Sequence, residues 1–462
     1  MGNLIVFLQR VDSLIWQPLF LLLVGSGLFL TYRLKGIQFR RLGFALKLAF
    51  TRHDDVAEGD ISHFQALMTA LAATIGIGNI AGIATAVSMG GLGALFWLWV
   101  TAFIGMATKY SEAILAIKYR VLDDRGEMAG GPMYYLEAGL GWKKMAIAFA
   151  IFGVITTLFT GNIVQSHSIT AAVTTVLPLK DWTIGLILAL LTGIVLIGGI
   201  RMIGGVTSFL VPIMAILYIA GSLIVLCLSY TQIPSAIGLI FRSAFTGQAA
   251  TGGFAGSTVM LAVQMGVARG VFSNESGLGT APIAAAAAKT DLPGRQALIS
   301  MTGAFLSTIV CTFTGLAIAV TGVFGQIGVD GKVLNGVPLT MAAFNTMIPY
   351  GGVLVMIGAI LFGYSTIVGW SYYGEKCMEY LFGTKAIFIY RLIFSIFVFL
   401  GVWMPLDLVW SLADIANAFM ALPNLIGLIA LTGITVRQTQ VFFLRVKNEE
   451  QERIAKPVLQ SD

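Results

Sequence analysis

Charged residues are scarce in this chain of 462 residues and make up only 11% of it. A soluble domain of ordinary composition carries about 25% charged residues. Hydrophobic residues account for 57% of the chain, and the mean hydropathy is +0.88. These values exclude a soluble enzyme and a disordered chain, and they predict a polytopic, all-α membrane protein.

Cysteine and histidine are scarce as well, with three residues of each. Cys227, Cys311 and Cys377 all lie in or beside apolar segments, so they form neither a disulfide framework nor a metal-ligand spacing. The histidines share no ligand spacing either. Since no nucleophile, base and orienting group can be combined into a catalytic triad, we expect a protein that is not an enzyme.

Long apolar runs fill most of the chain. A helix needs about 20 apolar residues to cross a membrane, and the runs predict eleven crossings, near 14–31, 64–89, 91–118, 144–177, 182–199, 203–229, 254–288, 296–323, 350–381, 386–401 and 407–435. The first is expected to be a retained helix. We expect four parts: an N-terminal helix with a basic loop, two five-helix repeats, and a basic cytoplasmic tail, over residues 1–60, 61–230, 231–435 and 436–462.

The positive charges are distributed unevenly. If the N-terminus lies outside and the sides then alternate, 22 of the 28 Lys and Arg residues fall on the inner side. The others divide between the outer side (Arg10, Lys180, Arg242 and Lys332) and the predicted helices (Lys109 and Arg269). Cytoplasmic loops attract Lys and Arg, so the pattern predicts a cell-membrane protein with its N-terminus outside and its C-terminus in the cytoplasm. The basic stretches indicate topology and not a nucleic-acid site.

Two of the predicted helices carry residues that disfavour a continuous helix. Residues 74–82 hold three glycines and an asparagine at membrane depth, and residues 269–282 hold opposite charges, hydroxyls, three glycines and a proline. Glycine costs about 1 kcal/mol in a helix interior, and unwound backbone is tolerated in a membrane only where it faces protein or a water-filled cavity. Close packing of helices on glycine is the alternative interpretation, and it accounts less well for Asn274, Glu275 and Pro282.

The positions of the two interrupted helices indicate a transporter. If the first helix is set aside, the interrupted helices are the first and the sixth of ten, and each begins one five-helix half. Paired broken helices at matching positions are typical of the binding site of a secondary transporter built from inverted repeats. Exposed N–H groups at one broken end attract a carboxylate, and unwound carbonyls coordinate a cation.

Several motifs resemble the alanine/glycine:cation symporter family. They are the sequences at 76–82, 90–101, 109–112, 130–135 and 272–279. The similarity runs from about residue 60 to 430. One departure from the family pattern is Leu98, where the family usually has methionine. The resemblance implies a leucine-transporter-like fold of two inverted five-helix repeats with one extra N-terminal helix. It also implies that a small neutral amino acid, alanine or glycine, enters together with sodium.

The resemblance also implies a sodium site. The backbone carbonyls of Ala72 and Ile75 are expected to face the ion from the first broken helix. The ninth run supplies Phe362, Ser365 and Thr366. The adjacent hydroxyls of Ser365 and Thr366 match the paired sodium-binding hydroxyls of the fold. Sodium is a hard cation that takes oxygen ligands. The alternative for these hydroxyls is a bond back to a carbonyl one turn earlier in the helix.

The broken segments are expected to supply the polar contacts of the substrate. By the same resemblance, Asn79 and the N–H groups near Gly76 and Gly78 are candidates for the carboxylate end. Asn274 and Ser276, from the second break, are candidates for either the ammonium group or the carboxylate. Both assignments follow from the half-helix ends of such transporters.

Four further side chains are candidates for the walls of the pocket. Gln165 follows a polar stretch in the fourth run and bonds either the ligand or a neighbouring helix. Phe159, Phe272 and Trp370 are expected to close the pocket and limit the size of the substrate. The alternative for each aromatic residue is ordinary packing between helices.

Charged residues inside the membrane are expected to be paired or functional. Lys109 and Glu112 are three residues apart and can pair on one helix, which favours a structural or gating role near the inner face. Glu275 is expected to brace its broken helix, with proton coupling left open. Asp407 and Asp414 lie near the outer end of the last helix, where a cap or gate role fits best.

The sequence therefore favours a secondary active transporter that couples sodium to a small neutral amino acid by alternating access. The alternative is a proton-coupled symporter or exchanger of the same fold. An ion channel would need a repeated pore loop or charged rings, which the sequence does not show. We expect sodium as the co-transported ion, a small amino acid as the substrate and the lipid bilayer as the surroundings. The oligomeric state is left open.

Overall fold

The computed structural model describes residues 2–51, 58–246, 258–290, 292–328, 331 and 333–455. Helices account for most of this part of the chain. The first ten are α1 Gly2–Arg33, α2 Ile37–Arg40, α3 Leu42–Phe50, α4 His63–Thr74, α5 Ala81–Gly90, α6 Gly93–Lys118, α7 Pro132–Leu140, α8 Lys143–Leu158, α9 Val164–Val176 and α10 Asp181–Ile197. The others are α11 Gly199–Leu228, α12 Ile233–Thr246, α13 Val259–Asn274, α14 Ala281–Ala286, α15 Pro293–Thr321, α16 Gly336–Met347, α17 Gly351–Phe382, α18 Ala386–Gly401, α19 Leu406–Ala430 and α20 Thr432–Ala455.

Membrane-spanning helices dominate the fold, as predicted. Among the described residues, seven helices are long and apolar enough to cross a membrane, and the bent pair α4 and α5 makes an eighth. The helices α10 and α18 are apolar but shorter, and α13 and α14 occupy the seventh predicted run. Each of the eleven predicted runs thus holds helix, while the number of crossings stays a prediction. The predicted start at residue 254 and the basic residues Arg52, Lys332 and Lys456 lie outside the described residues.

Several elements were not predicted from the sequence. The helices α7, α12 and α16 and a short antiparallel hairpin, β1 Val121–Leu122 with β2 Met128–Ala129, lie between the long runs. The predicted last run, 407–435, ends earlier than expected, at Ala430, and the basic tail continues as α20. A search for apolar runs of crossing length misses such elements because they are short or polar.

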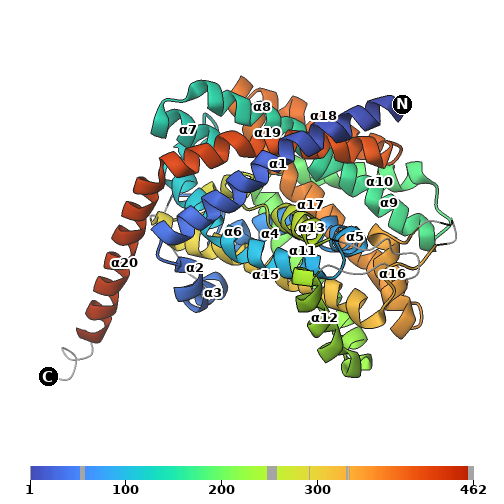
Figure 1. Cartoon of the computed structure of the whole chain (residues 1–462). Coiled ribbons are helices and arrows are strands. Elements are labelled where there is room, and N and C mark those ends of the chain that lie inside the picture. The colour runs from blue at the N-terminus through green and yellow to red at the C-terminus, as the bar shows by residue number, and fades with distance from the viewer. Residues whose placement is uncertain are drawn as a thin grey trace.

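The two broken helices lie in the middle of the bundle (Figure 1). Around them, α6 packs against α13 and α15, and α17 packs against α4, α8, α9 and α11. Helix α1 crosses the front of this view. Helix α20 follows α19 at a sharp bend and extends away from the bundle on the side opposite the N-terminus. Glycines allow close approach of α17: a Cβ atom at Gly369 would lie 2.9 Å from the Ala73 nitrogen.

The first break confirms the expected interruption of the second run. Helix α4 begins with a capping box, in which Ser62 and Gln65 exchange side-chain bonds with each other's backbone N–H groups. It ends at Thr74 and is followed by a 3₁₀ turn, Ile77–Asn79, before α5 begins. The axes of the two halves differ by 60°, so this segment is not a continuous helix packed on glycine.

The second break follows α13. Glu275, Gly277 and Gly279 have φ values of 50°, 90° and 80°. A left-handed conformation is costly for a residue with a side chain, so Glu275 is held there by its surroundings. Helix α14 then starts at Ala281, with Pro282 in its first turn, where a missing N–H costs no hydrogen bond. Proline therefore starts the second half-helix.

Candidate functional site

Asn79 braces the first break from inside. Its side-chain oxygen accepts a bond from the Gly76 N–H (3.2 Å), and its amide group donates to the Ser307 hydroxyl (2.8 Å) on α15. Its carbonyl accepts from the Thr314 hydroxyl (2.9 Å). The side chain is completely buried. Asn79 therefore compensates the backbone groups that the unwound turn exposes, as buried polar groups require.

Two neighbouring helices close over the unwound turn. The Gln165 amide oxygen, on α9, accepts from the Ile77 N–H at 3.2 Å. Gln165 follows a π-helical turn, Phe159–Ile163, that joins α8 to α9, and such turns are frequent at functional sites. On the other side, α17 approaches so closely that a Cβ atom at Gly76 would collide with the Thr366 hydroxyl. Glycine is therefore required at this position.

Oxygen atoms of α4 and α17 converge at the end of α4. The Thr366 hydroxyl lies 3.0 Å from the Ala72 carbonyl oxygen, and the Ser365 hydroxyl lies 3.4 Å from the same atom. The Ser365 hydroxyl also donates to the Phe362 carbonyl at 2.9 Å. Four of the five predicted sodium ligands thus share one buried cluster. Ile75 caps α4 through its N–H bond to Leu71 (2.6 Å), and the hydroxyls face Ala72 instead.

A narrow cavity of about 10 Å³ lies beside the first break. Of the predicted substrate residues, Gly76, Gly78, Gln165, Phe272 and Trp370 line it. The predicted sodium ligand Thr366 lines it too, together with six residues that were not predicted as substrate contacts: Ala73, Thr74, Thr160, Ser273, Glu275 and Leu278. Except for Phe272, which is half-buried, these side chains are buried. The side chains around the cavity are therefore tightly packed in this conformation.

Four predicted substrate residues lie outside the cavity lining. Asn79 braces the break, as described above. The Asn274 oxygen accepts from the Thr308 hydroxyl (3.2 Å) on α15. Ser276 lies against α1 and α6, in a separate small pocket. Phe159 packs in an apolar cluster with Ile163, Val164 and Val409.

Buried charges surround the second break. Lys109 is 2% exposed, and its ammonium group lies 3.4 Å from the Thr74 hydroxyl. The Glu275 carboxylate lines the cavity, and one of its oxygens accepts from the Thr280 hydroxyl (3.0 Å). The Glu112 carboxylate accepts from the Gly279 N–H (3.1 Å) and the Asn424 amide (2.7 Å). Glu112 therefore braces the second break in the way that Asn79 braces the first.

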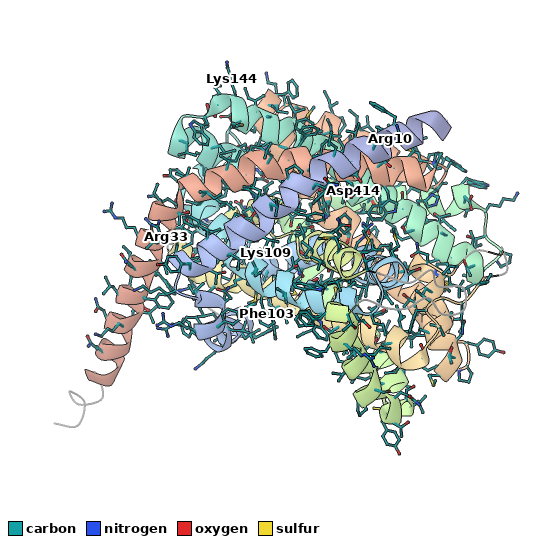
Figure 2. The ribbon with its side chains drawn as sticks, viewed as in Figure 1. Arg10, Arg33, Phe103, Lys109, Lys144 and Asp414 are labelled. Carbon is teal, nitrogen blue, oxygen red and sulfur yellow. The ribbon has the colours of Figure 1, made fainter. Side chains whose placement is uncertain are left out.

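Aromatic rings cover one side of the cavity. Phe272 packs on Trp410 with ring centroids 5.3 Å apart, and the Arg269 guanidinium lies 5.2 Å from the centre of the Trp410 ring. Asp414 follows one turn later on the same helix and is half-buried (Figure 2). The side chain of Asp407 lies outside the described residues. The cluster of Arg269, Phe272 and Trp410 joins α13 to α19, so it closes the cavity between these helices.

A second polar cluster lies where the β hairpin meets the end of α17. Lys376 bonds the carboxylates of Asp123 (3.3 Å) and Glu379 (2.9 Å). Burial raises the pKa of Asp123, but the bonds from the Glu127 and Arg125 N–H groups and the Lys376 ammonium outweigh it, so its pKa lies below the ordinary value. Burial raises the pKa of Asp60, which accepts from the Met128 N–H at 2.8 Å. These contacts fix the hairpin to α17.

The sequence is similar to one family of transporters along almost its full length. The profile of the sodium:alanine symporter family matches residues 1–456. The sodium/alanine symporter AgcS of Methanococcus maripaludis is 53% identical over 454 residues, which cover 97% of this chain and 99% of that protein. The probable sodium/glutamine symporter GlnT of Bacillus subtilis is 35% identical over 427 residues, covering 92% of this chain and 87% of that protein.

Solved structures show the fold. The crystal structure of MhsT in complex with L-phenylalanine has a TM-score of 0.56 and 12% identity, over 83% of this chain and 99% of that chain. The outward-open structure of a Na+-coupled sialic acid symporter has a TM-score of 0.53 and 13% identity, over 92% of this chain and 98% of that chain. The fold is therefore the leucine-transporter-like fold that the motifs implied.

Proposed function

The chain belongs to the sodium:alanine symporter family and is a sodium-coupled amino-acid symporter of the membrane, not an enzyme, and we propose that alanine or glycine is its substrate. The observation that carries the proposal is the position of the closed cavity. It lies between the first break, the second break and the hydroxyls of α17. In this conformation the cavity holds little more than one water molecule, so the surrounding helices must move apart to admit an amino acid.

We assign the sodium site to the oxygen cluster of α4 and α17. The carbonyls of Ala72 and Phe362 and the hydroxyls of Ser365 and Thr366 are neutral oxygen donors, which suit a hard monovalent cation. The Ile75 carbonyl, at the open end of α4, completes the predicted set after a small movement of the unwound turn. Because α4 and α17 both supply ligands, a bound ion holds the two helices together.

The substrate is assigned to the cavity next to this cluster. The substrate carboxylate lies next to Gly76 and Gly78, where the backbone N–H groups of the unwound turn can bind an anion. The Gln165 amide, which now bonds Ile77, exchanges that bond for one with the substrate. The ammonium group faces Glu275, whose second carboxylate oxygen is buried without a hydrogen-bond partner. Phe272 and Trp370 limit the length of the side chain.

A proton-coupled symporter is the second candidate, and one observation favours it. Lys109, Glu112 and Glu275 are three buried ionisable groups around one break, and such groups form proton relays in transporters. The sodium cluster of neutral oxygens and this charged cluster therefore predict different coupling ions. Sodium coupling agrees with the family, and the charged cluster is assigned to bracing and substrate recognition.

Binding of radiolabelled alanine to the purified protein tests the proposal. We expect alanine to bind in sodium chloride and to bind with an affinity lower by about tenfold or more in choline chloride, because the ion organises the broken helix. Glu275→Gln is expected to lose alanine binding in sodium. Binding that is equal in both salts and that depends on pH in the wild type, but not in Glu275→Gln, would favour proton coupling instead.

We also propose the orientation and the four-part division predicted from the sequence. Arg10 and Arg33 lie toward opposite ends of α1 (Figure 2), and Arg33 lines one groove with Arg40, Arg41 and Lys447. This distribution supports a cytoplasmic C-terminus and an outside N-terminus. Protease cleavage of α20 in inside-out but not in right-side-out vesicles is the expected result.

A further inference from the structure

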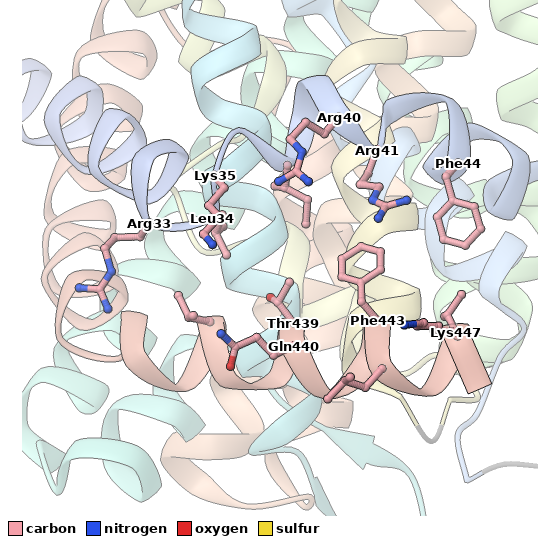
Figure 3. Close-up of a pocket in the computed structure, with 14 residues that line it drawn as sticks. Arg33, Leu34, Lys35, Arg40, Arg41, Phe44, Thr439, Gln440, Phe443 and Lys447 are labelled. Atoms are coloured by element: carbon pink, nitrogen blue, oxygen red, sulfur yellow. The ribbon is translucent and has the colours of Figure 1, made fainter. Parts of the chain in front are cut away.

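We propose that a groove between α2–α3 and α20 binds the headgroup of an anionic phospholipid. This basic groove has a volume of about 690 Å³ and is open to its surroundings. Figure 3 shows side chains of both walls pointing toward one another across it. Five basic residues line it: Arg33, Lys35, Arg40, Arg41 and Lys447. The proposal concerns a site that the transport reaction described above does not use.

The walls of the groove are held in place by buried contacts. Phe442 of α20 is 2% exposed and packs on Gly294, at the start of α15. Thr439 accepts from the Tyr110 hydroxyl of α6 at 3.0 Å. Across the groove, the Arg41 guanidinium lies 4.6 Å from the centre of the Phe443 ring. The tail helix is therefore attached to the bundle, and the groove is a fixed feature of the fold.

The charge of the groove is of one sign. No carboxylate lines it among the residues that the structure describes. The carboxylate that comes nearest along α20 is that of Glu449, which lies 4.0 Å from Arg295 and 3.7 Å from Arg445. All five basic residues are exposed. A concentration of positive charge without a carboxylate in the groove attracts an anion with several oxygens, such as a phosphodiester.

The apolar part of the groove distinguishes a lipid from a soluble anion. Its floor is formed by Leu34, Ile37, Phe44, Val436, Phe443, Leu444 and Val446. The surface of α1 that leads to it is apolar and exposed, with Leu21 at 79%, Leu28 at 51% and Tyr32 at 81%. A lipid can thus place its acyl chains along α1 and its phosphate among the cations, as in the basic pockets at the ends of transmembrane helices.

Native mass spectrometry of the full-length protein in detergent, titrated with phosphatidylglycerol and with phosphatidylcholine, tests the proposal. Each cation near an anionic lipid contributes about 1 kcal/mol, or about fivefold in affinity. Arg40→Gln/Arg41→Gln and, separately, Lys35→Gln/Lys447→Gln are each expected to weaken phosphatidylglycerol binding about 30-fold. The matched control Lys47→Gln/Arg437→Gln removes two exposed charges from the same region outside the groove and is expected to leave binding unchanged.

The second double variant keeps the contact between Arg41 and Phe443, so it reports on the lipid even if the first one detaches α20. Equal affinity for the two lipids would overturn the proposal, as would an equal loss in the control variant. Displacement of the bound lipid by millimolar glycerol phosphate would assign the groove to a soluble phosphate and overturn it as well. Alanine uptake by the variants under a sodium gradient confirms that each is folded.

Discussion

At the scale of single residues, the Thr366 hydroxyl lies between the proposed ion site and the first break. It bonds the Ala72 carbonyl of α4 and also occupies the space where a Cβ atom of residue 76 would lie. A single oxygen on α17 therefore touches both the proposed ion site and the turn that faces the substrate. Few other side chains of the described residues link the two.

Replacing Thr366 by valine keeps the shape of the side chain and removes its oxygen. We expect the sodium concentration for half-maximal alanine uptake to rise about tenfold or more, because losing a buried polar partner costs about 1–3 kcal/mol. Thr366→Ser is expected to restore most of the sodium affinity. Uptake kinetics at varied sodium measure this, and a valine variant with wild-type sodium dependence would contradict the assignment.

A substitution at Gly76 tests how closely the unwound turn packs against Thr366. A methyl group on Gly76 would collide with Thr366, so Gly76→Ala is expected to reduce alanine uptake to about a tenth of wild type or less, as overpacking of a close contact does. Gly205→Ala, on α11, places the same group in open space and is expected to retain uptake. Both variants are compared in proteoliposomes at equal protein amounts; wild-type uptake by Gly76→Ala would show that the turn adapts.

At the scale of elements, the two breaks are held by different chemistry. Asn79 braces the first with a neutral amide, whereas Glu112 and Asn424 brace the second with a carboxylate and an amide. The first brace also reaches α13, because the Ser307 hydroxyl that accepts from Asn79 donates to the Ser273 carbonyl at 2.9 Å. The unwound segments are thus fixed by side chains of neighbouring helices, as backbone inside a membrane requires.

Asn79→Ala tests the brace of the first break. The variant leaves the Gly76 N–H and the Ser307 hydroxyl without their amide partner, so we expect a clear loss of thermal stability, worth about 1–3 kcal/mol. Thermal unfolding in detergent, followed by the tryptophan signal, measures it. Asn448→Ala, exposed on α20, is the control. An unchanged melting temperature for Asn79→Ala, with lost alanine binding, would instead restore the substrate role predicted from the sequence.

The sequence predicted both breaks because glycine, proline and charge at membrane depth disfavour a helix regardless of tertiary contacts. It also predicted which residues of α17 approach α4. The sequence could not show where the side chains of the unwound turns point, since an irregular segment has no periodicity from which to infer a face. Asn79, Asn274 and Ser276 were therefore predicted as ligands, yet the first two bond neighbouring helices and Ser276 faces another pocket.

At the scale of the whole molecule, two side-chain clusters join elements that lie far apart in the sequence. The cluster of Arg269, Phe272 and Trp410 joins α13 to α19 on one side. The ion pairs of Asp123, Lys376 and Glu379 fix the β hairpin to α17. The hairpin was not predicted because two-residue strands leave no pattern in the sequence.

The hairpin contacts make stability depend on pH. The pKa of Asp123 is lower in the folded protein than in the unfolded chain, so its contribution is present above the unfolded pKa and is lost as the pH falls through the folded one. Asp123→Asn is expected to lower the melting temperature by a few degrees at pH 7, and the difference from wild type is expected to shrink below about pH 4. A difference that grows on acidification would contradict the assigned bonds.

The most direct test of sodium coupling is alanine uptake into proteoliposomes under an inward sodium gradient, with and without a proton ionophore. Wild type and Thr366→Ala are compared. Sodium-driven uptake that survives the ionophore and is lost in Thr366→Ala is the predicted result, because the hydroxyl belongs to the proposed ion site. Uptake that ignores sodium and follows the pH gradient would contradict the account and assign coupling to the buried charges around Glu275.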